Sequence, residues 1–310
     1  MRIPFTFSTL LPAIFGRQFG LTCWSFAAAL SLLVVTSDDA IGQEKYLLQY
    51  RFSPNQTIVT KVTHLATTET TINGNRQEST SRTVSERVWI VENVSKTGTA
   101  TILQSVRRVV MSQQLPGRPR VNYNSETDSE VPAEFEEVAK SIRKPLSRIK
   151  IDPSGEVVDR VDLLPNGVIP GLGQVVTPLP KKPVPIGAEW FFPIEVHVRL
   201  DDGTFKKIKT RQRYTLLSVK HGVATIRLKT QVLTPINDRR VEVQLVQQIT
   251  NGSIRFDMDS GQLDKKEVNW NESVIGYRGA DSRFKILARF TEETLGAEAI
   301  SARRNDLQKR

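Results

Sequence analysis

Apolar and polar residues alternate with a period of two along much of the chain that follows residue 43. The segment 194–200 has an apolar residue at every second position and a charged residue or histidine at the positions between. Segments 241–245 and 284–290 alternate in the same way, with one break at Leu287, and 57–71 is rich in threonine and valine. Because successive side chains of a β-strand point to opposite faces, this pattern predicts strands with one buried face. It indicates a mainly β fold.

Turn signals are closely spaced between these segments. Asn73-Gly74 and Asp202-Gly203 are typical of hairpins, because Asn, Asp and Gly tolerate a positive φ. The stretches 152–155 and 259–261 separate further apolar runs. Short connections of this kind favour antiparallel meanders over βαβ units. We therefore expect two antiparallel meander repeats that form curved sheets, either as a sandwich or as a half-barrel.

One segment, 132–143, has a helical pattern. Its glutamates cluster at the N-terminal end, where they favour the positive end of the helix dipole, and Pro145 follows its C-terminal end. Its apolar residues follow the i, i+3, i+4, i+7 spacing: Phe135, Val138, Ala139 and Ile142. We expect this helix to cover one face of a sheet. The alternative is a lid or plug over a cavity.

The two halves of the chain share several short stretches. Residues 96–102 match 220–226 at five positions without a gap, and 149–152 resembles 254–257. This predicts a duplication, although two unrelated meanders could share the same turn chemistry. The expected division is a first β repeat with the helix at 43–162, a Pro/Gly-rich linker at 163–187, a second β repeat at 188–293 and a polar tail at 294–310.

Residues 1–42 have the order of a secretory signal peptide. Arg2 and Arg17 precede an apolar run at 21–35, and the small-residue site Ala40-Ile41-Gly42 follows. The run of about 15 residues is short for a membrane-spanning helix. We expect cleavage before Gln43 and an exported protein, periplasmic or secreted, that does not span a membrane. The alternative is that the segment stays in place as an uncleaved anchor.

Two stretches resemble a known family. Residues 46–56 (YLLQYRFSPNQ) look like the opening strand and turn of a family of uncharacterised exported bacterial proteins, found mainly in planctomycete-like bacteria. Residues 178–190 (PLPKKPVPIGAEW) resemble the central proline-loop, Gly and Trp signature of that family. The resemblance implies export and a β-rich fold. It implies no catalytic residues, because the family is a domain of unknown function.

Signatures of catalysis are weak. The three histidines, His64, His197 and His221, are scattered, and each is interpreted as solvated. A single cysteine argues against a zinc cluster or a disulfide framework. The acidic stretch 257–264 has oxygen ligands suited to Ca²⁺, but its glycine does not fit an EF-hand loop, so a plain hairpin is favoured. No catalytic, cofactor-binding or metal-binding residue is predicted, and no cofactor is expected.

The net charge of the chain is +10, and one segment concentrates basic residues. Lys207, Lys209, Arg211 and Arg213 occupy alternate positions, so they are expected to line one face of a strand. Such a face could bind anionic lipid headgroups or an acidic envelope polymer. Export argues against nucleic acid as the partner. The alternative is a solvated face whose lysines prevent edge-to-edge aggregation.

Together these patterns predict an exported cell-envelope protein that binds a hydrophobic or anionic envelope ligand without catalysis. One alternative is a structural or adhesion module at the cell surface, and a less favoured one is a periplasmic hydrolase. Three of the four tryptophans, Trp89, Trp190 and Trp270, are expected to anchor the core, with a ligand-lining role as the alternative. The oligomeric state and the identity of the ligand are not predicted.

Overall fold

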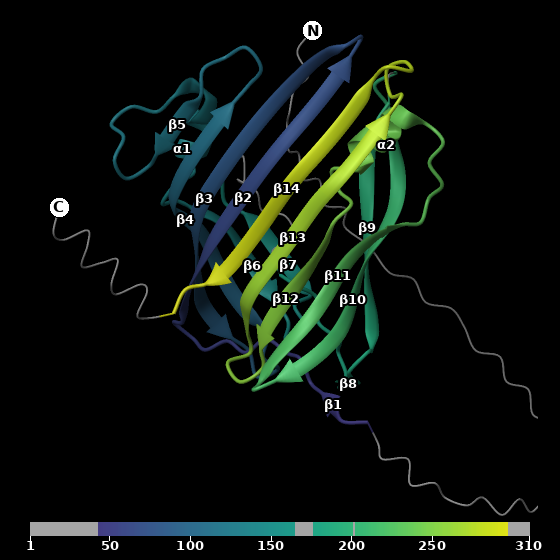
Figure 1. Cartoon of the computed structure of the whole chain (residues 1–310). Helices are drawn as coiled ribbons and strands as arrows, with labels where there is room; N and C mark the ends of the chain where they lie inside the picture. The colour runs from purple at the N-terminus through teal and green to yellow at the C-terminus, as the bar shows by residue number, and fades with distance from the viewer. Residues whose placement is uncertain (1–42, 165–175, 201, 297–310) are drawn as a thin grey trace, which may run out of the picture.

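The computed structural model describes residues 43–164, 176–200 and 202–296. In this part of the chain the fold is mainly β, built on one large antiparallel sheet that curves strongly and stays open (Figure 1). The expected signal peptide at 1–42 lies outside the described residues. So do the centre of the expected linker and most of the expected tail.

The N-terminal half supplies the elements up to residue 164. They are β1 (Lys45–Tyr46), β2 (Thr57–Ile72), β3 (Asn75–Val94), β4 (Ala100–Gln114), β5 (Val121–Asn124), the 3₁₀ helix η1 (Ala133–Phe135), α1 (Glu136–Ala139), β6 (Pro145–Ile151) and β7 (Val157–Asp162).

The C-terminal half supplies the remaining elements. They are β8 (Val184–Pro185), β9 (Glu189–Arg199), β10 (Phe205–Lys220), β11 (Val223–Val232), α2 (Arg239–Leu245), β12 (Asn251–Asp257), β13 (Gln262–Ile275) and β14 (Arg283–Thr294).

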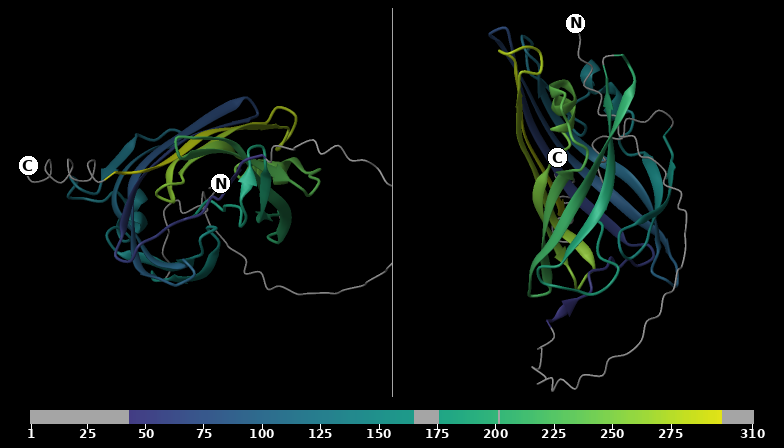
Figure 2. Two further views of the ribbon diagram at one scale, coloured as in Figure 1. Left: turned by 90° about the horizontal axis from the view of Figure 1, so that it is seen from below. Right: turned by 90° about the vertical axis from the view of Figure 1, so that its right-hand side faces the viewer.

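The large sheet is two meanders joined side by side. Its order is β7-β6-β4-β3-β2-β14-β13-β12-β11-β10-β9, with β5 added on β4, and every neighbouring pair is antiparallel. The strands β2 and β14 join the two halves along twelve paired residues, Thr60–Thr71 with Arg283–Thr294. The edges β7 and β9 are not paired with each other, and the sheet has a C-shaped cross-section (Figure 2). The predicted mainly β, antiparallel, curved fold is confirmed.

The sequence stretches shared by the two halves occupy equivalent places in the sheet. Residues 100–102 of β4 pair with 149–151 of β6, and residues 224–226 of β11 pair with 254–256 of β12. In both halves the pair follows a tight glycine turn, at Gly98 and at Gly222, each with a positive φ. This equivalence is what a duplication would produce. The duplication and its boundaries stay predictions.

The main core lies on the concave face of the sheet. Two segments cross this face, and we call them the N-terminal strap (47–52) and the linker strap (176–183). In the N-terminal strap the amide of Tyr50 donates to the Pro153 carbonyl, and the next amide donates to the Gly261 carbonyl. The strap therefore connects the β6–β7 turn of one half to the β12–β13 turn of the other. The Tyr50 ring packs edge-on against Phe256 of β12, with 5.2 Å between ring centroids.

The helix predicted at 132–143 is present but shorter. It spans η1 and α1, residues 133–139, and the chain then turns so that the Arg143 amide donates to the Val106 carbonyl. Arg143 has φ of 61°, a left-handed conformation that ends helical geometry. Phe135 is buried against Val106 and Leu146, so this segment covers one part of the sheet as expected.

The strand predicted at 241–245 is wrong, because this segment is the helix α2. The Asp238 side chain caps it by accepting a hydrogen bond from the Arg240 amide. Val241 and Leu245 are one helical turn apart, and both are buried against Val198 and other core residues. The apolar residues therefore share a helix face as well as a strand face, and the Asp cap favours the helix. No helix among the described residues has the length and apolar character that a membrane span requires.

Candidate ligand-binding site

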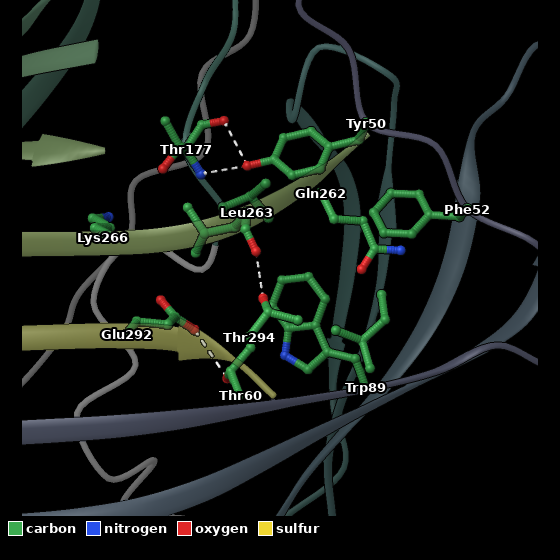
Figure 3. Close-up of a pocket in the computed structure, with 12 residues that line it drawn as sticks. Tyr50, Phe52, Thr60, Trp89, Thr177, Gln262, Leu263, Lys266, Glu292 and Thr294 are labelled. Atoms are coloured by element: carbon green, nitrogen blue, oxygen red, sulfur yellow. Dashed lines mark hydrogen bonds between the residues drawn. The ribbon is translucent and has the colours of Figure 1, made fainter. Parts of the chain in front are cut away.

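A pocket opens on the concave face between the two straps and the strands β2, β3, β13 and β14 (Figure 3). Its volume is about 450 Å³ when the part open to solvent is included. The cavity itself has a volume of about 30 Å³, room for about one water molecule, so a larger ligand would have to extend along the open part of the pocket. The lining residues are Tyr50, Phe52, Ile58, Thr60, Trp89, Val176, Thr177, Gln262, Leu263, Lys266, Glu292 and Thr294.

One wall of the pocket is apolar. Tyr50 and Phe52 of the N-terminal strap stack with 5.8 Å between ring centroids and nearly parallel planes. Ile58, Val176 and Leu263 complete the apolar lining. Residues 50 and 52 point the same way because the strap is extended, so both rings face the pocket.

The floor of the pocket contains charged residues. Glu292 of β14 and Lys266 of β13 line the pocket together with Thr60 of β2. Arg87 of β3 lies next to Thr60 but does not line the pocket. The strand register places them on one face, since Thr60 pairs with Arg87 and Lys266 pairs with Glu292. All four residues are at most 7% exposed. Charged residues are rarely buried to this degree unless they are paired or have a function.

The charged groups of the floor lie around one carboxylate. Glu292 Oε1 accepts a hydrogen bond from the Thr60 hydroxyl at 3.2 Å and lies 3.9 Å from Arg87 Nη1. Within the part of the chain that the structure describes, Lys266 Nζ makes no hydrogen bond and no ion pair within 4.0 Å. The cations of Arg87 and Lys266 therefore both lie near the carboxylate of Glu292.

Burial makes the protonated forms of Lys266 and Arg87 less stable. The pKa of Lys266 is lowered mainly by burial; Glu292 opposes this shift and Arg87 adds to it. The pKa of Arg87 is also lowered by burial, again against the effect of Glu292. An anion placed beside Lys266 would restore the stability of the ammonium form.

Further hydrogen-bond donors of the pocket have no protein partner. Trp89 Nε1 and Thr177 Oγ1 are buried, and neither has a hydrogen-bond partner among the described residues. The Tyr50 hydroxyl, by contrast, donates to the Thr177 carbonyl and accepts from the Thr177 amide, both at 3.2 Å (Figure 3). Both residues, like Lys266, line the pocket.

The predicted basic residues lie elsewhere, on the outer face of β10. Lys207, Lys209, Arg211 and Arg213 alternate with the buried residues Ile208 and Thr210, which face the core. The structure does not bring the basic residues to the pocket. Anion binding by this outer face stays a prediction.

Three of these basic side chains have neighbours from adjacent strands. Lys207 Nζ lies 3.0 Å from a carboxylate oxygen of Glu195, and Arg213 Nη1 lies 3.6 Å from one of Glu189. The Arg211 guanidinium lies over the Phe191 ring at 4.2 Å. The outer face of β10 is therefore a mixed surface of cations, carboxylates and an aromatic ring.

The interpretation of the histidines as solvated is wrong for His64. It lies half-buried on the inner face, and its ring packs edge-on against Trp270 with 6.0 Å between centroids. The burial of His64 was hard to predict because β2 is rich in threonine, so the inner face of this strand has no strong apolar pattern. His197 Nε2 is 2.9 Å from a Glu195 carboxylate oxygen, and His221 occupies a turn with φ of 49°.

The acidic stretch at 257–264 forms the β12–β13 hairpin turn. One Asp257 carboxylate oxygen accepts hydrogen bonds from the amides of Asp259 and Ser260, at 2.9 and 3.2 Å. These bonds stabilise the turn and lower the pKa of Asp257, against the effect of its partial burial. In the described ranges, no group of three or more His, Cys, Asp or Glu residues is arranged to hold a metal ion.

The tryptophans divide between the two roles considered for them. Trp89 belongs to the main core and also lines the pocket. Trp190 and Trp270 pack at the edge of the core, and their indole N–H groups donate to the carbonyls of Pro178 and Gln247. Of these three indole N–H groups, that of Trp89 is the one without a hydrogen-bond partner in the described residues.

The charged floor was missed by the sequence analysis, although a signal was present. Residues 284, 286, 288 and 290 form the apolar face of β14, and continuing the same period reaches Glu292. Likewise Lys266 precedes Val268 and Trp270 on the inner face of β13. A charged residue at an apolar-face position of a long strand is the signal that identifies both.

Burial of His64 predicts a pH effect on stability. Burial lowers the pKa of His64 in the folded state below its unfolded value of about 6.5, so the unfolded state binds the proton more readily. The free energy of unfolding should therefore fall as the pH drops from about 7 to about 5, and His64→Gln should lose less stability over this range. Urea midpoints at several pH values measure the difference.

The comparison with His64→Gln separates the pH effect of His64 from that of a second titrating group, Glu272. Burial raises the pKa of Glu272, which acts in the opposite direction over part of this range, but the group is present in both proteins. Equal pH dependence of wild type and His64→Gln would show that His64 does not sense acidification.

Comparisons with known proteins give distant structural likenesses. The sequence matches no protein-family model and no curated protein. Lipovitellin, in a structure titled for its lipid–protein interactions, is similar at a TM-score of 0.45 and 10% identity; the match covers 79% of this chain and 26% of lipovitellin, so the chain spans about a quarter of that protein.

Two other solved structures are similar at lower scores. A DUF1329 family protein from Desulfovibrio piger, from a domain family of unknown function, has a TM-score of 0.15 at 11% identity, covering 74% of this chain and 83% of that one. The translocator domain of the autotransporter NalP from Neisseria meningitidis has a TM-score of 0.20 at 7% identity, covering 79% and 90%. Likenesses at these scores do not establish a shared fold, so function has to be inferred from the chain's own residues.

Proposed function

We propose that this chain is an exported cell-envelope protein that binds an apolar envelope ligand, such as a lipid, without converting it. The observation that supports this most directly is the pocket on the concave face. It combines an apolar wall with buried, partnerless hydrogen-bond donors. Such a combination is typical of sites that bind amphipathic molecules.

The open sheet suits this role. A curved sheet without pairing between its edges leaves its concave side accessible between the covering segments. The straps cover one end of the concave face, and α1 and α2 pack over other parts of it. The proposed ligand would replace water on the apolar wall, which contributes about 25 cal/mol for each Å² of apolar surface buried.

Export belongs to the same proposal. It is supported by the signal-peptide pattern at 1–42 and by the resemblance to exported proteins of planctomycete-like bacteria. Expression of the full chain with its own N-terminus tests it directly. We expect a protein in the periplasm or medium that begins at Gln43.

Lipid analysis of that exported protein tests ligand binding. An organic extract of the purified protein should contain lipid in an amount comparable to the protein, as measured by mass spectrometry. Leu263→Trp should reduce the lipid strongly, because the larger side chain fills the pocket. Leu217→Trp is the matched control, since this leucine is exposed on β10 and does not line the pocket. Extracts without lipid, or equal lipid in both variants, would contradict the proposal.

A second candidate function rests on the outer face of β10. Lys207 and Lys209 are exposed there, and Arg211 lies over the exposed ring of Phe191. This mixture suits adhesion to an anionic envelope polymer or lipid surface. Replacement of Lys207, Lys209 and Arg211 by Glu should release the protein from envelope fractions, because the face changes sign.

The test of this second candidate is sedimentation of the protein with purified envelope fractions. Binding of the wild-type protein should weaken as salt is raised above about 0.15 M, where exposed charges are screened beyond about 8 Å. Binding that ignores both salt and the triple substitution would rule out adhesion through this face.

A further inference from the structure

A hollow lies on the convex face of the sheet, across the neighbouring strands β2, β3 and β4. Its volume is about 260 Å³, compared with about 30 Å³ for the cavity of the concave pocket. This volume is close to the lower end of the range of about 300–1,000 Å³ typical of small-molecule sites. We call it the outer hollow, and its lining residues are Lys61, Arg82, Val84, Ser85, Glu86, Arg108 and Val110.

The strand register sets the layout of the outer hollow. Trp89 of β3 belongs to the main core on the concave side, so the side chains at 82, 84 and 86 of the same strand face the convex side. Lys61 lies directly opposite Glu86 on one side, and Arg108 lies directly opposite it on the other. Glu86 is only 4% exposed, so neighbouring side chains cover it at the bottom of this end of the hollow.

The carboxylate of Glu86 already has basic partners. Its Oε2 accepts hydrogen bonds from Arg107 Nε and Nη2, at 3.1 and 2.5 Å, and its Oε1 lies 3.9 Å from Arg108 Nη1. Arg108 Nε lies 2.8 Å from Glu126 Oε2. These contacts orient the Arg108 guanidinium between two carboxylates. A guanidinium has five N–H donors, so Arg108 retains donors for a ligand.

Two other cations of the outer hollow have no carboxylate partner. Among the described residues, the side chains of Lys61 and Arg82 make no hydrogen bond and no ion pair within 4.0 Å. Lys61 is half-buried, whereas Arg82 is exposed. The lining as a whole contains three cations and one carboxylate. This excess of positive charge favours an anionic ligand.

The middle of the outer hollow is apolar. Val84 of β3 lies directly opposite Val110 of β4, and both line the hollow. They separate the end that holds Lys61 and Arg108 from Arg82, which lies about 13 Å away along β3 at about 3.3 Å per residue. An inorganic anion would occupy one end only, whereas a phosphate on a small organic group can contact both.

We propose that the outer hollow binds a phosphate monoester of a sugar or similar polyol. Lys61 and Arg108 hold the phosphate from either side of Glu86, the organic group lies over the two valines, and Arg82 donates to its hydroxyl oxygens. A guanidinium fork and an ammonium are the groups that bind phosphate most strongly in proteins. The charge of a phosphate monoester near pH 7, about −1.5 to −2, matches the excess of cations in the lining.

Calorimetric titration of the protein with glucose 6-phosphate, glucose and inorganic phosphate tests the proposal. Glucose 6-phosphate should bind at least about tenfold more tightly than glucose, which cannot form charge-assisted hydrogen bonds. It should also bind several-fold more tightly than inorganic phosphate, which does not reach Arg82. Its binding should weaken as salt is raised above about 0.15 M.

Two variants assign the two ends of the ligand. Lys61→Met should weaken both glucose 6-phosphate and inorganic phosphate at least about tenfold. Arg82→Gln should weaken glucose 6-phosphate several-fold and leave inorganic phosphate nearly unchanged. The matched controls are Lys285→Met and Arg283→Gln, which remove a half-buried lysine and an exposed arginine from β14, outside the lining. Both controls should bind like wild type, and all four thermal midpoints should stay close to the wild-type value.

Vesicles distinguish a soluble ligand from a lipid headgroup with the same chemistry. The protein is sedimented with phosphatidylcholine vesicles that contain either phosphatidylinositol 4-phosphate or phosphatidylinositol. Preference for the phosphorylated lipid, lost in Lys61→Met, would support a headgroup as the source of the phosphate. Binding of glucose 6-phosphate without vesicle association would support a soluble sugar phosphate.

Two results would overturn the proposal. One is glucose 6-phosphate that binds no more tightly than glucose, together with vesicles that show no preference for the phosphorylated lipid. The other is binding that Lys61→Met and Arg82→Gln leave unchanged. The outer hollow and the concave pocket lie on opposite faces of the sheet, so the lipid content of Leu263→Trp is an independent result. Either proposal can therefore fail without the other.

Discussion

Replacement of Glu292 by leucine should lower the free energy of unfolding by about 3 kcal/mol, the lower end of the range for breaking a buried charge pair. The substitution removes the carboxylate that faces both Arg87 and Lys266 and deprives the Thr60 hydroxyl of its acceptor. The lower end applies because the closest ion-pair distance is 3.9 Å, and because Lys266 can lose its proton. Urea denaturation of wild type and variant measures the change.

Two further variants separate charge from hydrogen bonding. Glu292→Gln keeps an acceptor for Thr60 and should isolate the effect of the charge. The double variant Glu292→Leu with Lys266→Met should recover much of the lost stability, since an apolar replacement of buried charges is often neutral or stabilising. Additive effects of the two substitutions would show that Lys266 and Glu292 are not coupled through the floor of the pocket.

Replacement of Phe256 by alanine should lower the free energy of unfolding by about 3–5 kcal/mol. Its side chain is fully buried at the centre of the main core and packs against the Tyr50 ring of the N-terminal strap. The substitution removes a large apolar side chain and leaves a cavity beside the strap. The change is measured by chemical denaturation, with the expected loss far above the error of the method.

Controls for this variant come from the same chain. Phe256→Leu retains most of the volume and should cost less than the alanine variant. Phe205→Ala should have little effect, because the Phe205 side chain is 61% exposed at the start of β10. A loss for Phe256→Ala no greater than that for Phe205→Ala would show that the concave face is not the main core.

Much of the sheet could be predicted from local patterns. The long alternation in 284–290 and the turns at 73–74 and 259–261 correspond to β14 and to hairpins in the structure. These features depend on neighbours in sequence, which is why a single sequence reveals them. The pairing of β2 with β14 could not be predicted in this way, because it joins segments more than 200 residues apart.

The error at 239–245 has a physical cause. Apolar residues at 241, 243 and 245 satisfy a strand pattern, while the pair 241 and 245 also satisfies a helix pattern. Over seven residues the two periods are hard to distinguish, so the capping residue Asp238 was the better guide.

The pocket was not predicted from the sequence, because the basic residues that stand out there are those of the densely charged segment 207–213. Surface lysines such as Lys207 and Lys209 are numerous and mostly solvated, whereas Lys266 is a single charge on a buried face. Its companions Arg87 and Glu292 come from other strands, and their proximity depends on the sheet order and register. Only the fold brings them together.

The most direct test of the central claim is photocrosslinking with a fatty acid that carries a diazirine on its chain. After irradiation, labelled peptides of the exported protein are mapped by mass spectrometry, with and without excess laurate. Ligand binding in the concave pocket predicts labels in the N-terminal strap and near Leu263, and their loss when laurate competes. Labels confined to residues 205–213 of β10, or labels that laurate does not displace, would contradict it.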